Sequence, residues 1–135
     1  SSAASDVYKR QFRAGIDAGA DFVMVGHMIV TDISNITSDL SKEIVTDILR
    51  TELGFSGVII TDSLQMESIT DTYSAGDAAI YAVAAGNDMI LEPENLEQAV
   101  EGIKQAVKDQ IIAETQINES VRRILVMKHT AIEKE

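Results

Sequence analysis

Three short apolar segments at regular intervals constrain the fold of this chain more than any other feature. They are Phe22–Val25, Val58–Thr61 and Met89–Leu91, and each is apolar and partly β-branched. Segments of this kind are typical of strands that are covered on both faces of a sheet. Their starts lie roughly 30–36 residues apart, which is the length of one βα unit. We therefore expect parallel strands joined through helices, an α/β fold.

Helical periodicity fills the stretches between the predicted strands. Residues 12–18 resemble the end of a helix that enters the first strand, and Thr115 or Asn118 is expected to start a last helix. The predicted helix caps are, in chain order, Ser41, Ser74 with Asp77, and Asn95 with Gln98. Helices, strands and caps together predict about three βα units plus terminal helices.

Composition excludes several classes of function. A net charge of −11 opposes binding to nucleic acid and to anionic lipid. The chain has no cysteine, which rules out disulfides, thiolate catalysis and zinc ribbons. Its two histidines are too distant in sequence for a local metal motif, and neither a signal peptide nor a membrane-spanning run is recognisable. The compartment stays open, and because residue 1 is not Met we expect a processed, truncated or excised chain.

Ionisable residues follow the predicted strands. In parallel α/β folds ligands bind at the carboxyl ends of the strands, which here read Gly26-His27, Thr61-Asp62-Ser63 and Glu92-Pro93. Asp62 projects directly from a strand, so its carboxylate can attack an electrophilic carbon, hold a cation or accept a phosphoryl group. The structural alternative is that Asp62 only caps the following turn.

The other residues at this edge have open roles. His27 can carry a proton, hydrogen-bond a substrate, or be a core histidine satisfied by the backbone. Glu92 before Pro93 is interpreted as a turn residue. Met66 is expected mainly to pack, although it can also line the wall of a pocket.

Four blocks of the sequence resemble glycoside hydrolase family 3. GFSGVIITDSLQM at residues 54–66 is similar to the nucleophile region of its β-N-acetylhexosaminidase branch, whereas the β-glucosidase branch more often has Ser-Asp-Trp there. The other blocks resemble the sixth strand, the eighth strand and the closing helix of the family's barrel. They are AGADFVMVGH at 18–27, AGNDMILEP at 85–93 and INESVRRIL at 117–125.

The resemblance implies the C-terminal portion of a (β/α)₈ TIM barrel over residues 12–135, preceded by an unmatched remnant over residues 1–11. Asp62 would be the nucleophile of a retaining exo-glycosidase that releases terminal β-linked N-acetylglucosamine through a covalent glycosyl-aspartate, with cell-wall fragments as one expected source of substrate. His27 and Met66 would be substrate-binding residues, and the reaction needs no metal or organic cofactor. Hydrogen-bond donors that keep the nucleophile ionised are expected near Thr61 and Ser63.

The sequence departs from the family pattern in three places. The acid/base histidine with its aspartate, and a sugar-binding block similar to Lys-His-Phe-Pro-Gly-His-Gly, are both missing from this chain. We therefore expect the isolated chain to be inactive, and His27 does not inherit the acid/base role. Residues 37–41 read Thr-Ser-Asp-Leu-Ser where the family has Pro-Ala-Thr-Leu-Ser, a change for which we expect no clear consequence.

Three other functions remain as alternatives. One is a β-glucosidase-type member of the same family, and another is a non-catalytic sugar-binding module. The third is a receiver-like phosphoacceptor, which needs an acidic pair after its first strand and a late Lys-Pro. Here the first strand ends in Gly-His and the single proline follows Glu92, so the receiver pattern is not met.

Overall fold

The computed structural model describes residues 2–133, with side chains from Asp6 onward. Ser1 and residues 134–135, which fall within the predicted segments 1–11 and 12–135, lie outside the described residues. No helix within 2–133 combines the length and apolarity needed to cross a membrane. The elements are α1 (Ser2–Asp17), β1 (Phe22–Val25), η1 (Ser38–Leu40), η2 (Glu43–Glu52), β2 (Val58–Ser63), α2 (Glu67–Thr70), α3 (Ala75–Ala85), β3 (Met89–Leu91), α4 (Leu96–Lys108) and α5 (Glu114–Glu133).

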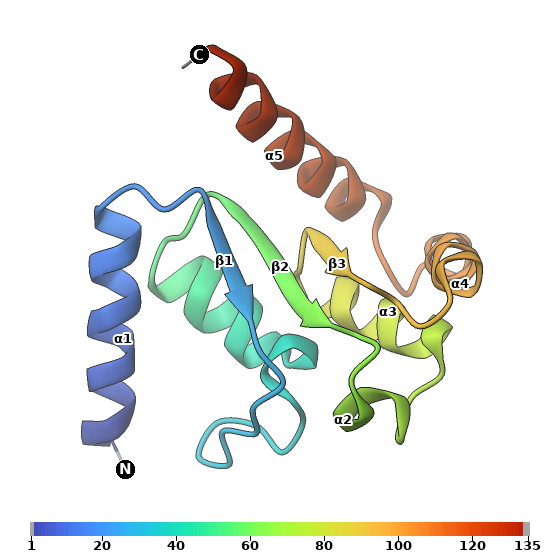
Figure 1. Ribbon diagram of the computed structural model, residues 1–135, viewed down its shortest axis with the longest axis horizontal. Helices are drawn as coiled ribbons and strands as arrows, with labels where there is room; N and C mark the ends of the chain where they lie inside the picture. Colours follow the sequence, from blue (N-terminus) through green and yellow to red (C-terminus); the bar gives the residue numbers. More distant parts are fainter. Residues whose placement is uncertain (1, 134–135) are drawn as a thin grey trace.

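The strands form one parallel sheet in the order β1-β2-β3, as the sequence predicts (Figure 1). Phe22 pairs with Val58, and Ile60 pairs with Met89. Strand β2 continues through Ser63 instead of ending at Thr61, so Asp62 belongs to the strand itself. Its neighbour Thr61 pairs with β1 and its neighbour Ser63 pairs with β3, so the backbone on either side of Asp62 is held more firmly than a loop would be.

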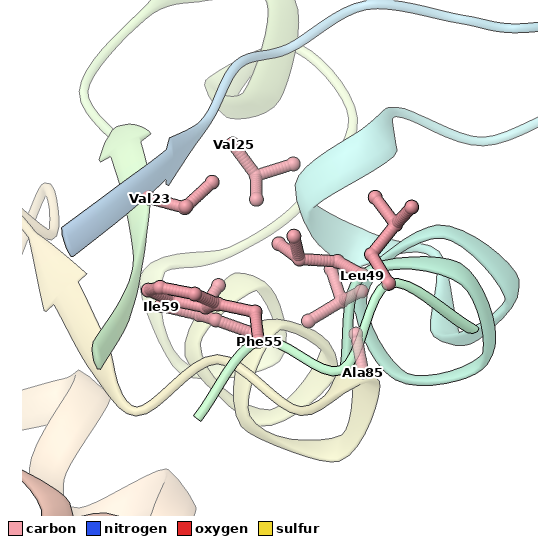
Figure 2. Packing of buried hydrophobic residues seen from close by; sticks show 8 residues of the cluster. Val23, Val25, Leu49, Phe55, Ile59 and Ala85 are labelled. Atoms are coloured by element: carbon pink, nitrogen blue, oxygen red, sulfur yellow. The ribbon is translucent and has the colours of Figure 1, made fainter. Parts of the chain in front are cut away.

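One face of the sheet carries the core. Val23 and Val25 of β1 and Ile59 of β2 pack against Leu49 of η2 and against Phe55, which precedes β2 (Figure 2). Burying an aliphatic side chain contributes roughly 1.5–3 kcal/mol, so this cluster fastens η2 to the sheet.

The opposite face of the sheet is exposed along β1, whereas Val58 of β2, which pairs with Phe22, is fully buried. Alternation along β1 places Phe22 and Met24 there, and they are 41% and 52% exposed. In a closed barrel, strand side chains alternate between the surrounding helices and the barrel interior. The structure has the corresponding arrangement, an α/β portion of a barrel with helices on one face.

The helix after residue 41 differs from the prediction. Ser41 does not cap it: the N-cap position is Lys42, and the Ser41 hydroxyl donates to Glu43 Oε2 at 2.9 Å. The helix follows Lys42 and has π geometry, ending with a hydrogen bond from Leu53 N to Ile48 O. Its apolar residues still face the core, so the predicted burial is correct although the helix type is not.

The other predicted caps are present. Ser74 Oγ accepts from Asp77 N at 3.1 Å at the start of α3, and Asn95 Oδ1 accepts from Gln98 N at 3.0 Å at the start of α4. Helix α3 ends at Gly86, whose φ of 113° favours glycine and whose hydrogen faces the Thr46 hydroxyl. The last helix begins earlier than predicted, at Glu114.

A buried carboxylate joins several elements at the amino end of the sheet. The side chain of Asp88, just before β3, is 0% exposed. Its Oδ2 accepts from Arg50 Nη2 at 2.6 Å and from Ile59 N at 2.9 Å. Its Oδ1 accepts from Ser120 Oγ at 2.7 Å and from Arg123 Nη1 at 2.9 Å. This one side chain therefore connects η2, β2 and α5.

Candidate active site

Asp62 lies where the sheet ends, at the edge toward which β1 and β2 both point (Figure 1). Ser63 N donates to Asp62 Oδ1 at 2.8 Å. The other oxygen, Oδ2, lies 4.0 Å from the position that a Cβ would take on Gly26. The carboxylate therefore reaches across the end of β1, with one oxygen held by a backbone donor.

The two neighbours of Asp62 have different roles. Ser63 provides the donor through its backbone. Thr61 is fully buried, and its Oγ1 accepts from Leu91 N at 3.0 Å, which joins β2 to β3. The sequence predicted hydrogen-bond donors to Asp62 near Thr61 and Ser63. In the structure the Ser63 N–H is such a donor, whereas the Thr61 side chain bonds within the sheet.

His27 is enclosed at the same edge, with a side chain that is 3% exposed. Its Nε2 lies 2.7 Å from the carbonyl oxygen of Ser63, and its Nδ1 lies 2.9 Å from Asp39 Oδ2. A carbonyl oxygen only accepts, so Nε2 carries the proton in that bond. Both ring nitrogens are thus engaged by protein groups.

The charge states of this pair favour bound protons. Burial lowers the pKa of His27, but the Ser63 carbonyl, Asp39 and the charge of Asp62 together raise it above its ordinary 6.5. Burial raises the pKa of Asp39 above 3.8, and the contact with His27 opposes this in part. Both groups hold protons more tightly than they would in water.

Asp39 is the site residue that the sequence interpretation missed. It belongs to η1, where residues 37–41 are all buried, and its backbone carbonyl accepts from Asn87 Nδ2 at 2.6 Å. The expectation that the change at residues 37–41 has no consequence is wrong, because Asp39 pairs with His27. The signal was present: a charged residue stands where the family pattern has threonine.

Met66 and Glu92 complete this edge. Met66 directly precedes α2, its side chain is 46% exposed, and its N–H donates to the Ser63 carbonyl at 3.3 Å. Glu92 is exposed with a φ of 43°, in agreement with its interpretation as a turn residue. Asp62, His27 and Met66 thus all contact the backbone of Ser63. Residues 2–133 contain no group of three acidic or histidine side chains placed to hold a metal ion.

The family model for the glycosyl hydrolase family 3 N terminal domain matches residues 3–127. The chain belongs to glycosyl hydrolase family 3. This membership sets aside the receiver-like alternative. The match begins upstream of Phe12, and the predicted division of the chain between residues 11 and 12 stays a prediction.

Two bacterial relatives and a solved structure resemble the chain over much of its length. A "Beta-N-acetylglucosaminidase/beta-glucosidase" from Cellulomonas fimi is 31% identical over 87% of this chain and 23% of its own. A "Beta-hexosaminidase" from Stenotrophomonas maltophilia is 39% identical over 69% of this chain and 28% of its own. A solved family 3 β-N-acetylglucosaminidase from Paenibacillus sp. superposes with a TM-score of 0.84 at 36% identity, over 87% of this chain and 23% of that one. The chain spans about a quarter of these relatives.

Proposed function

We propose that this family 3 chain supplies the nucleophile of a retaining exo-glycosidase, and that Asp62 is this nucleophile. The observation that carries the proposal is the position of its carboxylate, held at the carboxyl end of β2 by the Ser63 N–H. That donor fixes the orientation of the carboxylate, and a carboxylate is the attacking group in retaining glycosidases. Asp62 Oδ2, which accepts no hydrogen bond from the described residues, is the attacking oxygen.

The reaction follows from this placement. Asp62 Oδ2 bonds to the anomeric carbon while the bond from that carbon to the leaving oxygen breaks, and an acid protonates this oxygen. Water then attacks the anomeric carbon, the base takes its proton, and the aspartate leaves. Two displacements at the same carbon give retention of configuration.

The acid/base group of this proposal lies outside the chain. His27 is unsuited to that role, since its side chain is 3% exposed and both of its nitrogens face protein groups. The isolated 135-residue chain should therefore hydrolyse glycosides poorly, because loss of the proton donor alone commonly costs about 10² to 10⁴ in rate. Robust turnover of a chromogenic N-acetylglucosaminide by this chain alone would contradict the assignment.

Terminal β-linked N-acetylglucosamine is the proposed substrate, with cell-wall fragments as one source. The names of the two bacterial relatives and of the Paenibacillus enzyme support it, as does the Ser-Leu-Gln-Met that follows Asp62. Met66, exposed beside Asp62, is proposed to contact the sugar. The alternative, a β-glucosidase-type enzyme, is favoured by the double name of the Cellulomonas relative. The ratio of kcat/KM for N-acetylglucosaminide and glucoside separates the two.

The test of Asp62 uses the complete barrel that carries this chain. We expect Asp62→Asn to lower kcat by roughly 10⁴-fold or more, since removal of a nucleophile has effects of this order. Asp71→Asn is the matched control, an exposed aspartate beyond α2 that should keep its activity. A fluorinated sugar that slows the second displacement should leave a mass adduct on the Asp62 peptide. Unchanged kcat in Asp62→Asn, or an adduct elsewhere, would refute the proposal.

A further inference from the structure

The carbonyl of Ser63 is a convergence point that the proposed chemistry does not explain. It accepts from His27 Nε2 at 2.7 Å and from Met66 N at 3.3 Å. On the other side of the same residue, the N–H donates to Asp62 Oδ1 at 2.8 Å. The backbone that orients the proposed nucleophile is therefore held by a buried histidine from a different strand.

We propose that His27 is a positioning residue for Asp62: it donates from Nε2 to the Ser63 carbonyl, and Asp39 holds its ring from the opposite side. This inference rests on the proposed function of Asp62 and extends it. In this proposal His27 does not contact the sugar, in contrast to the substrate-binding role that the family resemblance implied. Asp39 gains a role at a position where the family pattern has an uncharged threonine.

The geometry of the imidazole supports positioning over contact with substrate. Its Nε2 is committed to Ser63, and its Nδ1 faces Asp39, whose side chain is 0% exposed. A ring that is 3% exposed offers no nitrogen to a sugar. Because the carbonyl requires a proton on Nε2, the bond to Ser63 persists whether His27 is neutral or charged.

The arrangement also differs from an ordinary satisfied core histidine. The contact of Nδ1 with Asp39 has the distance of an ion pair but not the geometry of a good hydrogen bond, so Nδ1 and both Asp39 oxygens lack a hydrogen-bond partner among the described residues. Buried polar atoms without such partners are destabilising, and they tend to occur where function requires them. The chain places this costly pair against the carbonyl of Ser63, the residue after Asp62.

Two amide substitutions separate the functions of the two ring nitrogens. In His27→Gln the amide nitrogen can occupy the place of Nε2 and still donate to Ser63. In His27→Asn the shorter amide reaches the place of Nδ1, near Asp39, and leaves the Ser63 carbonyl without this donor. The pair is nearly matched in polarity, and neither variant introduces a charge.

Steady-state kinetics in the complete barrel provide the first test. We expect His27→Asn to lower kcat by about 10- to 100-fold with little change in KM, because a displacement of about 1 Å at a reacting group has effects of this size. His27→Gln should recover most of the lost kcat. Equal kcat values for the two variants, or a raised KM with kcat unchanged, would overturn the positioning role. The Asp62→Asn variant separates failure of the positioning role from failure of the proposed function, because it tests the nucleophile independently of His27.

A spectroscopic test covers the case in which His27→Asn does not fold. Two-bond ¹H–¹⁵N correlation spectra of the wild-type barrel, compared with those of His27→Gln, identify the signals of the His27 ring. We expect Nε2 to remain protonated across the titration of the ring. A neutral ring that carries its proton on Nδ1 would overturn the proposal, because it cannot donate to Ser63.

Discussion

The two ends of the sheet each bury one aspartate, and they treat it differently. At the amino end, Asp88 receives four hydrogen bonds, two of them from the arginines Arg50 and Arg123. At the carboxyl end, Asp39 has a histidine at ion-pair distance, and its carboxylate oxygens have no hydrogen bond of good geometry among the described residues. Both side chains are 0% exposed, so exposure does not explain the contrast.

The different partners of Asp88 and Asp39 indicate that the amino end of the sheet contributes to stability and the carboxyl end to chemistry. Arginine stays charged in proteins, so Arg50 and Arg123 both need a counter-ion, and Asp88 lies against both of them. Histidine can lose its proton, so the pair of His27 and Asp39 can adjust its charge. In barrels of this type the carboxyl ends of the strands carry the active site and the amino ends carry stability. The placement of the two carboxylates follows this division.

The largest effect that tests the comparison is on stability. Asp88→Asn should lower the free energy of unfolding by about 3–5 kcal/mol, because it leaves Arg50 and Arg123 as partly buried charges without a counter-ion. Urea unfolding followed by circular dichroism measures this loss. Glu101→Gln, which breaks an exposed ion pair with Lys104, is the control and should change the stability little. A small loss in Asp88→Asn would show that the amino end is not the stabilising end.

Sequence alone predicted the features that depend on neighbouring residues. The bounds of β1 and β3, the cap of α3 at Ser74 and the cap of α4 at Asn95 all follow from local patterns, and the structure has them. The position of Asp62 at the carboxyl edge of the sheet was also predicted from the sequence, because the carboxyl ends of parallel strands lie at the same edge.

The features that sequence did not predict depend on distant residues. Asp88 meets Arg50 and Arg123 only after η2 and α5 have packed on the sheet, and His27 meets Ser63 only when β1 and β2 are in register. Long-range polar contacts of this kind have no periodic signal in a sequence. The missing cap at Ser41 is a local exception, since its hydroxyl contacts Glu43, only two residues away.

Removing the charge of Asp39, at the carboxyl end of the sheet, should affect stability less than removing the charge of Asp88. Asp39→Asn should change the free energy of unfolding by about 1 kcal/mol or less at pH 8, because above its ordinary pKa of 6.5 His27 can lose its proton at little cost when its counter-ion is removed, whereas arginine cannot. The loss in Asp88→Asn is expected to be several times larger. Comparable losses in the two variants, measured in the same urea titrations, would erase the distinction between the two ends.

The pH dependence of this variant gives the most specific test. In the wild type the pKa values of Asp39 and His27 are both raised. At any pH between the ordinary pKa of one of these groups and its pKa in the folded protein, the folded state therefore binds more protons than the unfolded state, and stability falls as the pH rises. The stabilisation from His27 is complete below pH 6.5 and is lost as the pH rises through its raised value. In Asp39→Asn the contribution of Asp39 to the raised pKa of His27 is gone, while burial still lowers this pKa and the Ser63 carbonyl still raises it, so the decline should shrink. His129 is present in both proteins and its contribution cancels. We therefore expect the urea midpoint of the variant to rise relative to that of the wild type as the pH increases from 5 to 9. Two parallel curves of midpoint against pH would show that the charge states of Asp39 and His27 are not coupled.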